Sequence, residues 1–257
     1  MSANRIIHIA ADAGKIILEN GGETYRVEET MSRICNAFGI SLAESFVTPT
    51  GIMISVTTDC DQTITIVKRI KSRTVDLEKI AKVNDLSRNI KSQGLTLDQV
   101  KVELNTINTT KRYSDKTLIL FSCITVSFFT LMFGGDFHDF CVSFIIGGLI
   151  KILTLALSKV NLNDFFINVL GGALAALLAL LSVNFNLATH VDKITIGSIM
   201  LLVPGLSITN AIRDTIAGDL LAGISRALEA FLIAVAIAAG SGTIITLWVI
   251  YFGGSLI

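Results

Sequence analysis

Charged residues are scarce in this 257-residue sequence. Asp, Glu, Lys and Arg make up 16% of it, against about 25% in soluble globular proteins, whereas 51% is hydrophobic and the mean hydropathy is +0.67. This composition excludes a disordered chain, a collagen and a coiled coil. It also excludes an ordinary soluble enzyme, unless the apolar excess is confined to one part of the chain. The formal net charge is +0, so nothing in it points to nucleic acid as a partner.

The sequence also lacks the common cysteine and glycine motifs. Its four cysteines form no CxxC pair, so neither a disulfide framework nor a zinc site is predicted. There is no Walker loop, Gly-x-Gly-x-x-Gly or Gly-x-Ser-x-Gly motif, and the missing Walker loop argues against ATP-driven transport by this chain. We expect no cofactor and no bound metal, since His138 and His190 stand singly in predicted external loops.

The charges that are present divide the chain in two. Residues 1–116 hold 16 of the 21 Lys and Arg and 14 of the 21 Asp and Glu. We therefore predict a cytosolic α+β domain over 1–116 and a transmembrane helical domain over 117–257. Residues 1–20 lack the continuous apolar run of a signal peptide. Their apolar positions recur at helical spacing, and we favour a helix packed on its own domain over one lying on the membrane surface.

Within the first domain, helical spacing predicts helices over about 23–38, 75–93 and 97–113. The alternating, β-branched stretch 45–58 predicts two strands separated by a turn at Thr48–Gly51, and 63–70 predicts a third. Hydroxyl side chains at this turn are more often turn or ladder residues than nucleophiles.

The second domain is mostly hydrocarbon. A spanning helix needs about 20 mostly apolar residues, and five segments qualify, which predicts an α-helical multi-pass membrane protein of about five spans. The predicted spans are Thr117–Phe133, Phe140–Leu157, Phe165–Val183, Ile194–Ile212 and Ala227–Phe252. Glycine pairs at Gly147-Gly148 and Gly171-Gly172 favour close helix packing over an internal repeat.

Orientation follows from the basic residues in the short loops. The flanking cations are Lys111, Arg112, Lys116, Lys159, Arg213 and Arg226, and the opposite loops carry Asp136, Asp139 and Asp192. The alternation predicts a cytoplasmic N-terminus and an external C-terminal tail, 253–257. Lys151 lies midway along the second span, where snorkelling and a functional ion pair are both open.

The stretch 203–230 combines a helix break with charge in apolar surroundings. Pro204 and Gly205 interrupt the predicted fourth span, and transporters use broken helices at binding sites. Arginine suits a carboxylate ligand, and Asp or Glu can carry protons. The alternative is a loop helix with solvated ion pairs. We predict substrate-binding or coupling roles for Pro204, Gly205, Asn210, Arg213, Asp214, Asp219, Arg226 and Glu229.

Three stretches together carry a resemblance: 19–30 (ENGGETYRVEET), 46–52 (FVTPTGI), and the pattern Val203-Pro204-Gly205 with the polar and glycine positions up to Glu229. In this order they resemble the threonine/serine exporter family. The resemblance implies export of small hydrophilic metabolites from the bacterial cytoplasm across the inner membrane, and related two-component versions are linked to succinate export. With five spans, the chain resembles the larger subunit of the split form. A smaller membrane subunit is the implied partner. The lipid bilayer, a small-molecule substrate and a further copy of the chain are the other candidate partners.

The first hypothesis is therefore a proton-coupled secondary exporter subunit and not an enzyme. Arg213 or Arg226 would engage the substrate carboxylate, and Asp214, Asp219 or Glu229 would couple a proton. The alternative is a membrane-anchored hydrolase acting through its cytosolic domain near Thr48–Gly51, and a scaffold without flux of its own is the third.

Overall fold

The computed structural model describes residues 3–57, 62–110, 113–160 and 162–253. The chain forms two compact units. The first contains Met1–Arg112 and Gly205–Leu228, and the second contains Tyr113–Pro204 and Glu229–Ile257. Residues 205–228 thus group with the charged N-terminal part of the chain, although the sequence assigned them to the apolar part. The domain boundary expected at residue 116 stays a prediction.

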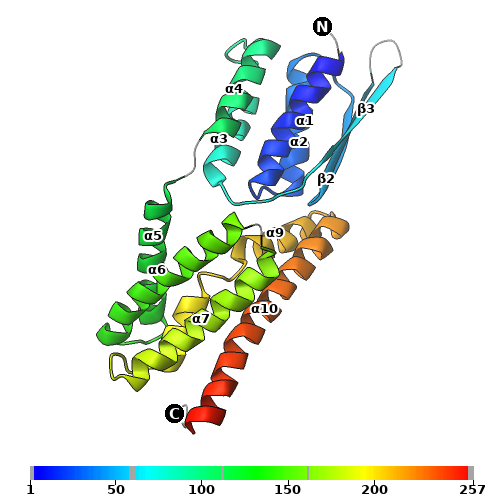
Figure 1. Cartoon of the computed structure of the whole chain (residues 1–257). Coiled ribbons are helices and arrows are strands. Elements are labelled where there is room, and N and C mark those ends of the chain that lie inside the picture. Colours follow the sequence, from blue (N-terminus) through cyan, green and yellow to red (C-terminus); the bar gives the residue numbers. More distant parts are fainter. Residues whose placement is uncertain (1–2, 58–61, 111–112, 161, 254–257) are drawn as a thin grey trace. The chain divides into compact units, whose positions relative to one another are not determined.

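The first unit contains a three-stranded antiparallel sheet in the order β1-β2-β3 (Figure 1). The strands are β1 (Ala43–Thr48), β2 (Gly51–Thr57) and β3 (Thr63–Arg69). They follow one another as a meander, because the Thr48–Gly51 turn reverses the chain and pairs Val47 with Ile52. The predicted strands and turn are confirmed.

Two helices cover one face of this sheet. They are α1 (Ala3–Glu19) and α2 (Thr24–Ala37). Ile7 and Ile17 of α1 are fully buried in one hydrophobic core with Ile52 and Ile54 of β2. Each such side chain contributes roughly 1.5–3 kcal/mol through burial. The amphipathic N-terminal helix therefore packs on its own domain, as expected.

The helices α3 (Leu77–Asn89) and α4 (Leu97–Thr109) complete the N-terminal part of this unit. Asp76 caps α3 by accepting from the Lys79 amide, and Thr96 forms a capping box with Gln99 at the start of α4. Both predicted helices are confirmed. Of the cations that were expected to precede the first span, Lys111 and Arg112 lie outside the described residues.

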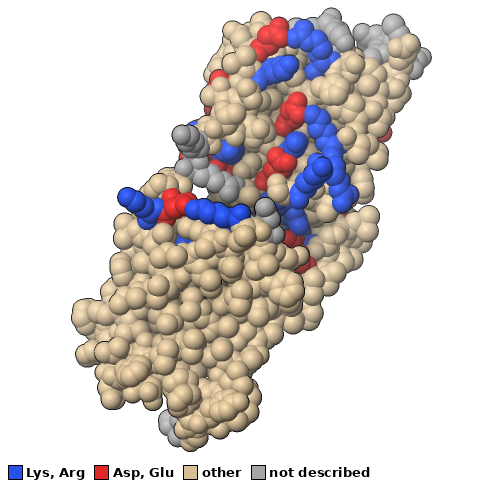
Figure 2. All heavy atoms as spheres, viewed as in Figure 1, with Lys and Arg blue, Asp and Glu red and all other residues tan. Residues whose placement is uncertain are grey.

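In the described part of the second unit, apolar helices predominate. Four helices are long and apolar enough to cross a membrane: α5 (Asp115–Met132), α6 (Phe137–Lys159), α7 (Asp164–Asn184) and α10 (Leu220–Phe252). The first residues of α10 belong to the first unit, and the helix continues into the second from Glu229. On the face drawn in Figure 2, charged side chains gather over the first unit, and the surface of the second is mostly uncharged.

The expected span over 194–212 does not form one continuous helix, and the break that the sequence predicts at Pro204 and Gly205 is confirmed. The segment instead forms two short helices, α8 (Val191–Ile199) and α9 (Gly205–Ile216), with non-helical backbone from 200 to 204. Pro204 has no amide hydrogen to continue a helix. With nine residues, α8 is only about 14 Å long, against the roughly 30 Å of a bilayer core.

The glycine pairs serve close packing, as favoured from the sequence. A Cβ atom on Gly147 would lie 2.8 Å from the Ser122 carbonyl oxygen of α5. On Gly172 it would lie 2.6 Å from the Ile237 carbonyl oxygen of α10. A side chain at either position would force the helix backbones apart, so these glycines set the spacing of the helices.

Candidate functional site

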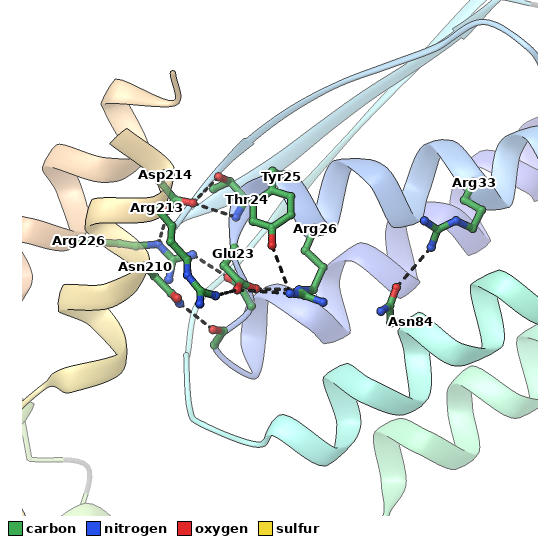
Figure 3. Close-up of polar contacts among 12 residues, drawn as sticks. Glu23, Thr24, Tyr25, Arg26, Arg33, Asn84, Asn210, Arg213, Asp214 and Arg226 are labelled. Atoms are coloured by element: carbon green, nitrogen blue, oxygen red, sulfur yellow. Dashed lines mark hydrogen bonds and ion pairs between the residues drawn. The ribbon is translucent and has the colours of Figure 1, made fainter. Parts of the chain in front are cut away.

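The turn before α2 presents two backbone carbonyl groups to side chains from a distant part of the chain. Gly21 adopts φ +94°, a conformation that favours glycine, and a Cβ atom on Gly22 would lie 2.3 Å from the Ile17 side chain. The Gly21 oxygen accepts from the Asn210 side chain at 2.9 Å, and the Gly22 oxygen accepts from Arg226 at 2.8 Å. The Gly21-Gly22 pair therefore binds α9 and the first part of α10 (Figure 3).

A buried ion pair lies directly behind this turn. Arg226 Nε and Asp214 Oδ2 are 2.9 Å apart, with their side chains 5% and 0% exposed. The Thr24 hydroxyl donates to Asp214 Oδ1 at 2.7 Å, and the Thr24 amide donates to the same oxygen at 3.3 Å. Because a buried charge is costly without a partner, these contacts make Asp214 and Arg226 structural elements of the first unit.

Two arginine side chains donate hydrogen bonds to Glu23, the residue that immediately precedes α2. Arg26 Nε donates to Glu23 Oε2 at 2.8 Å, and an Arg213 terminal nitrogen donates to Glu23 Oε1 at 2.5 Å. The Glu23 side chain is 9% exposed and that of Arg213 is 54% exposed. Burial opposes ionisation of Glu23, but the hydrogen bonds from Arg26 and Arg213 outweigh it and place the pKa of Glu23 below its usual value.

Two further carboxylates, those of Asp219 and Glu28, belong to the same cluster. Asp219 Oδ2 lies 3.0 Å from the Thr24 hydroxyl. Glu28, one turn along α2 from Thr24, is half-buried. Burial, together with the negative charges of Asp219 and Asp214, raises the pKa of Glu28. The cluster therefore combines a fully buried ion pair with carboxylates that are partly open to solvent.

Five of the eight predicted site residues come together here: Asn210, Arg213, Asp214, Asp219 and Arg226. Gly205 begins α9 in the same unit, whereas Pro204 and Glu229 belong to the second unit. The predicted shared face of Asn210 and Asp214 is confirmed, because both side chains are buried toward the start of α2.

The sequence reasoning missed the partners that α2 supplies. Glu23, Thr24 and Glu28 are about 190 residues away along the chain, and no spacing rule connects them to α9. The available signal was the 19–30 stretch, which contains all three and which carried part of the family resemblance.

A second cluster of polar side chains lies in the second unit, where the first residues of α6 and α8 meet. Ligand atoms of Asp136, Asp139 and His190 lie within 4.8 Å of one another and could hold a metal ion. The sequence reasoning did not foresee this, because it treated His190 singly. Hydrogen bonds already use these atoms: His190 Nδ1 is 2.8 Å from Asp139 Oδ2, and Asp139 Oδ1 accepts from the Thr189 and His190 amides. This geometry accounts for the cluster as a cap shared by α6 and α8.

Comparison with known proteins adds independent information. A family model described as "Putative threonine/serine exporter" matches residues 8–248. A "Probable threonine/serine exporter" of Mycobacterium tuberculosis is 21% identical over 93% of this chain and 46% of its own length. A "Threonine/serine exporter" of Corynebacterium glutamicum is 24% identical over 92% of this chain and 50% of its own length. The chain thus spans about half the length of these relatives.

A shorter relative matches from end to end. The "Probable succinate transporter subunit YjjP" of Escherichia coli is 21% identical over 95% of this chain and 94% of its own length. No solved structure matches the chain.

Proposed function

Because the chain belongs to the threonine/serine exporter family, we propose that it is a membrane subunit of a secondary exporter of small hydrophilic metabolites. Threonine- or serine-type amino acids and dicarboxylates such as succinate form the proposed substrate class, since relatives carry both names. The apolar helices α5, α6, α7 and α10 support a location in a bacterial inner membrane.

The two candidate arginines differ in how far their side chains are exposed to solvent. Arg226 is buried against Asp214 and the Gly22 carbonyl, whereas the Arg213 side chain is 54% exposed. A substrate carboxylate could reach Arg213 without disrupting the buried ion pair. We therefore assign carboxylate binding to Arg213, and give Asn210, Asp214 and Arg226 the task of holding α9 against the start of α2.

A further part of the proposal is that export is coupled to proton transfer. Asp214 faces Arg226 and has a permanent counter-ion, whereas Asp219 and Glu28 are partly exposed and lie close to further negative charge. A carboxyl group without a dedicated cation is better suited to exchanging a proton. Asp219 is the proposed coupling residue, and Glu229 and the Pro204–Gly205 break remain further candidates in the transport path.

The test measures efflux of L-threonine and of succinate from preloaded cells. Arg213→Ala is expected to lower efflux about tenfold or more, since a charge-assisted hydrogen bond contributes about 1.5–3 kcal/mol. Asp219→Asn is expected to remove the dependence of efflux on the proton gradient. Lys101→Ala, at an exposed position of α4, is the matched control. Normal export by both site variants, at normal protein level in the membrane, would contradict this assignment.

A second membrane subunit is part of the proposal. The full-length match is to proteins named as transporter subunits, and the chain spans about half of the longer exporters. Co-expression with a chain of four or five apolar spans is expected to raise efflux, and an unchanged efflux would favour a scaffold instead. Crosslinking in the same co-expression experiment also tests whether copies of this chain associate with one another.

The proposed orientation places the first unit in the cytoplasm and the C-terminus outside. Lys159 and Asp115 are 3.1 Å apart at one end of the α5–α6 pair, and Asp136 and Asp139 lie at the opposite end. The basic end is assigned to the cytoplasm.

Hydrolase chemistry is less well supported. At the Thr48–Gly51 turn, the Thr48 hydroxyl lies 3.4 Å from the Thr50 hydroxyl and from the Gly51 carbonyl. These are contacts typical of a turn. The named relatives are transporters.

A further inference from the structure

Two arginines from different helices converge on the single carboxylate of Glu23 (Figure 3). Arg26 comes from α2 itself, and Arg213 comes from α9. We propose that Glu23 occupies the position of the substrate carboxylate when the site is empty, and that Arg26 is the second arm of the anion site. This inference rests on the proposed exporter function, and it adds an internal competitor and a specificity residue to the site.

The exposure of the three side chains fits such an exchange. Glu23 is covered at 9% exposure, whereas Arg213 is 54% and Arg26 is 29% exposed. Both arginine side chains are therefore open to solvent over part of their surface. A small carboxylate could engage them there and replace Glu23 stepwise, without first separating two buried charges.

The chemistry of the exchange is balanced. A guanidinium carries five N–H donors in a planar fork that matches a carboxylate, and Glu23 uses one nitrogen of Arg213 and two of Arg26. The incoming carboxylate and Glu23 have the same geometry, and Glu23 is ionised because Arg26 and Arg213 hold its pKa down. One carboxylate replaces another, so the net charge of the two-arginine site is the same before and after the exchange.

The second arm is held in place by its neighbour. The Arg26 guanidinium donates to the Tyr25 hydroxyl at 3.2 Å and lies 5.7 Å from the centre of the Tyr25 ring. Arg26 therefore keeps a partner if Glu23 moves away. It remains available to a ligand together with Arg213.

The same helix provides a matched control. Glu29 pairs with Arg33 one turn further along α2, with side chains that are 51% and 25% exposed. This pair has one carboxylate and one arginine at i,i+4 spacing, and among the described residues α9 forms no hydrogen bond or ion pair with either side chain. A general effect of removing a Glu–Arg pair from α2 would appear in both places.

The experiment uses the full chain with its partner subunit, reconstituted in vesicles, and L-threonine and succinate as probes. Glu23→Gln keeps the size of the side chain but removes the competing charge. The KM for the transported carboxylate is expected to fall about three- to tenfold, because a site that is self-occupied most of the time shows a correspondingly weakened apparent affinity. Glu29→Gln is expected to leave KM unchanged.

Two more variants make the result specific. Arg26→Gln is expected to raise KM for the same probe. Lys101→Gln, at an exposed position of α4, is expected to leave KM unchanged. Combining Glu23→Gln with Arg213→Gln is expected to abolish the gain in affinity, since the vacated fork is then lost. L-Threoninol, which lacks the carboxylate, is expected to inhibit threonine efflux equally weakly in the wild type and in Glu23→Gln.

The outcomes separate this inference from the proposed function. If the wild type exports neither probe, the exporter proposal fails. If the wild type exports and Glu23→Gln raises KM or leaves it unchanged, Glu23 is not a competitor and the inference alone is overturned. If Glu23→Gln does not fold, the Arg26→Gln variant decides, and an unchanged KM in it overturns the inference.

Discussion

Each of the two units of this chain is stabilised internally by a different kind of contact. In the first, α2 and the turn before it are joined to α9 and to the start of α10 by directional polar contacts such as Thr24–Asp214 and Gly22–Arg226. In the second, α7 is joined to α10 by glycines that allow backbone approach, as at Gly172 and Gly240. The polar junction is sensitive to charge, and the glycine junction is sensitive to volume. Variants that change one property at a time can test this distinction.

The largest effect is expected at the buried ion pair. Asp214→Asn and Arg226→Gln should each destabilise the protein by about 3–5 kcal/mol, since each removes one member of a buried ion pair. The double variant should lose less than the sum, because the two residues act as a pair. Unfolding in detergent micelles measures both. Glu78→Gln, which removes an exposed i,i+4 partner of Lys82, should cost no more than about 0.5 kcal/mol.

An intermediate effect is expected at the glycine junction. A Cβ atom on Gly240 would lie 1.9 Å from the Val169 carbonyl oxygen, so Gly240→Ala should destabilise by about 1–3 kcal/mol through overpacking. Gly242 is the control, because its Cβ position has no atom within 4 Å. Gly242→Ala should stabilise the helix by about 0.5–1 kcal/mol. Equal thermal midpoints for the two variants would show that volume is not what limits this junction.

The smallest effect is a pH dependence at the polar junction. Burial and the charges of Asp219 and Asp214 raise the pKa of Glu28 in the folded state. The stability that its protonated form provides is therefore complete below the pKa of the unfolded chain, and it is lost as pH rises through the folded-state value. Glu28→Gln should raise the thermal midpoint at pH 8 and have no effect near pH 4. The exposed Glu29→Gln should show no such trend, and a parallel trend in both would contradict the proposed cause.

The fold of the N-terminal part could be predicted because its signals are local. The strand alternation in 45–58, the turn at Thr48–Gly51 and the apolar stripe of α1 each report on neighbouring residues. The expected span over 194–212 is not one continuous helix, and the sequence did show where it breaks, since Pro204 and Gly205 interrupt its apolar run. The decisive residues were Pro204, which ends regular hydrogen bonding, and the buried Asp214, which requires Arg226 and Thr24.

The candidate site was half accessible to sequence reasoning. Polar residues in the apolar stretch 203–230 were conspicuous, and Asn210, Arg213 and Asp214 do gather in one place. Their partners, Glu23 and Thr24, belong to a helix that looks like an ordinary charged surface helix. A contact across about 190 residues depends on tertiary packing, which no periodicity within either segment contains.

The shared cap at Asp139 has a mechanical consequence for the second unit. Its carboxylate accepts from the amides of Thr189 and His190 at the entrance to α8 and from the amide of Asp136 at the entrance to α6. The first turn of α8 is thereby pinned to α6 through one side chain that is 0% exposed. This helix of nine residues is held near its other end as well, because a Cβ atom on Gly197 would lie 2.8 Å from the Thr130 amide nitrogen of α5.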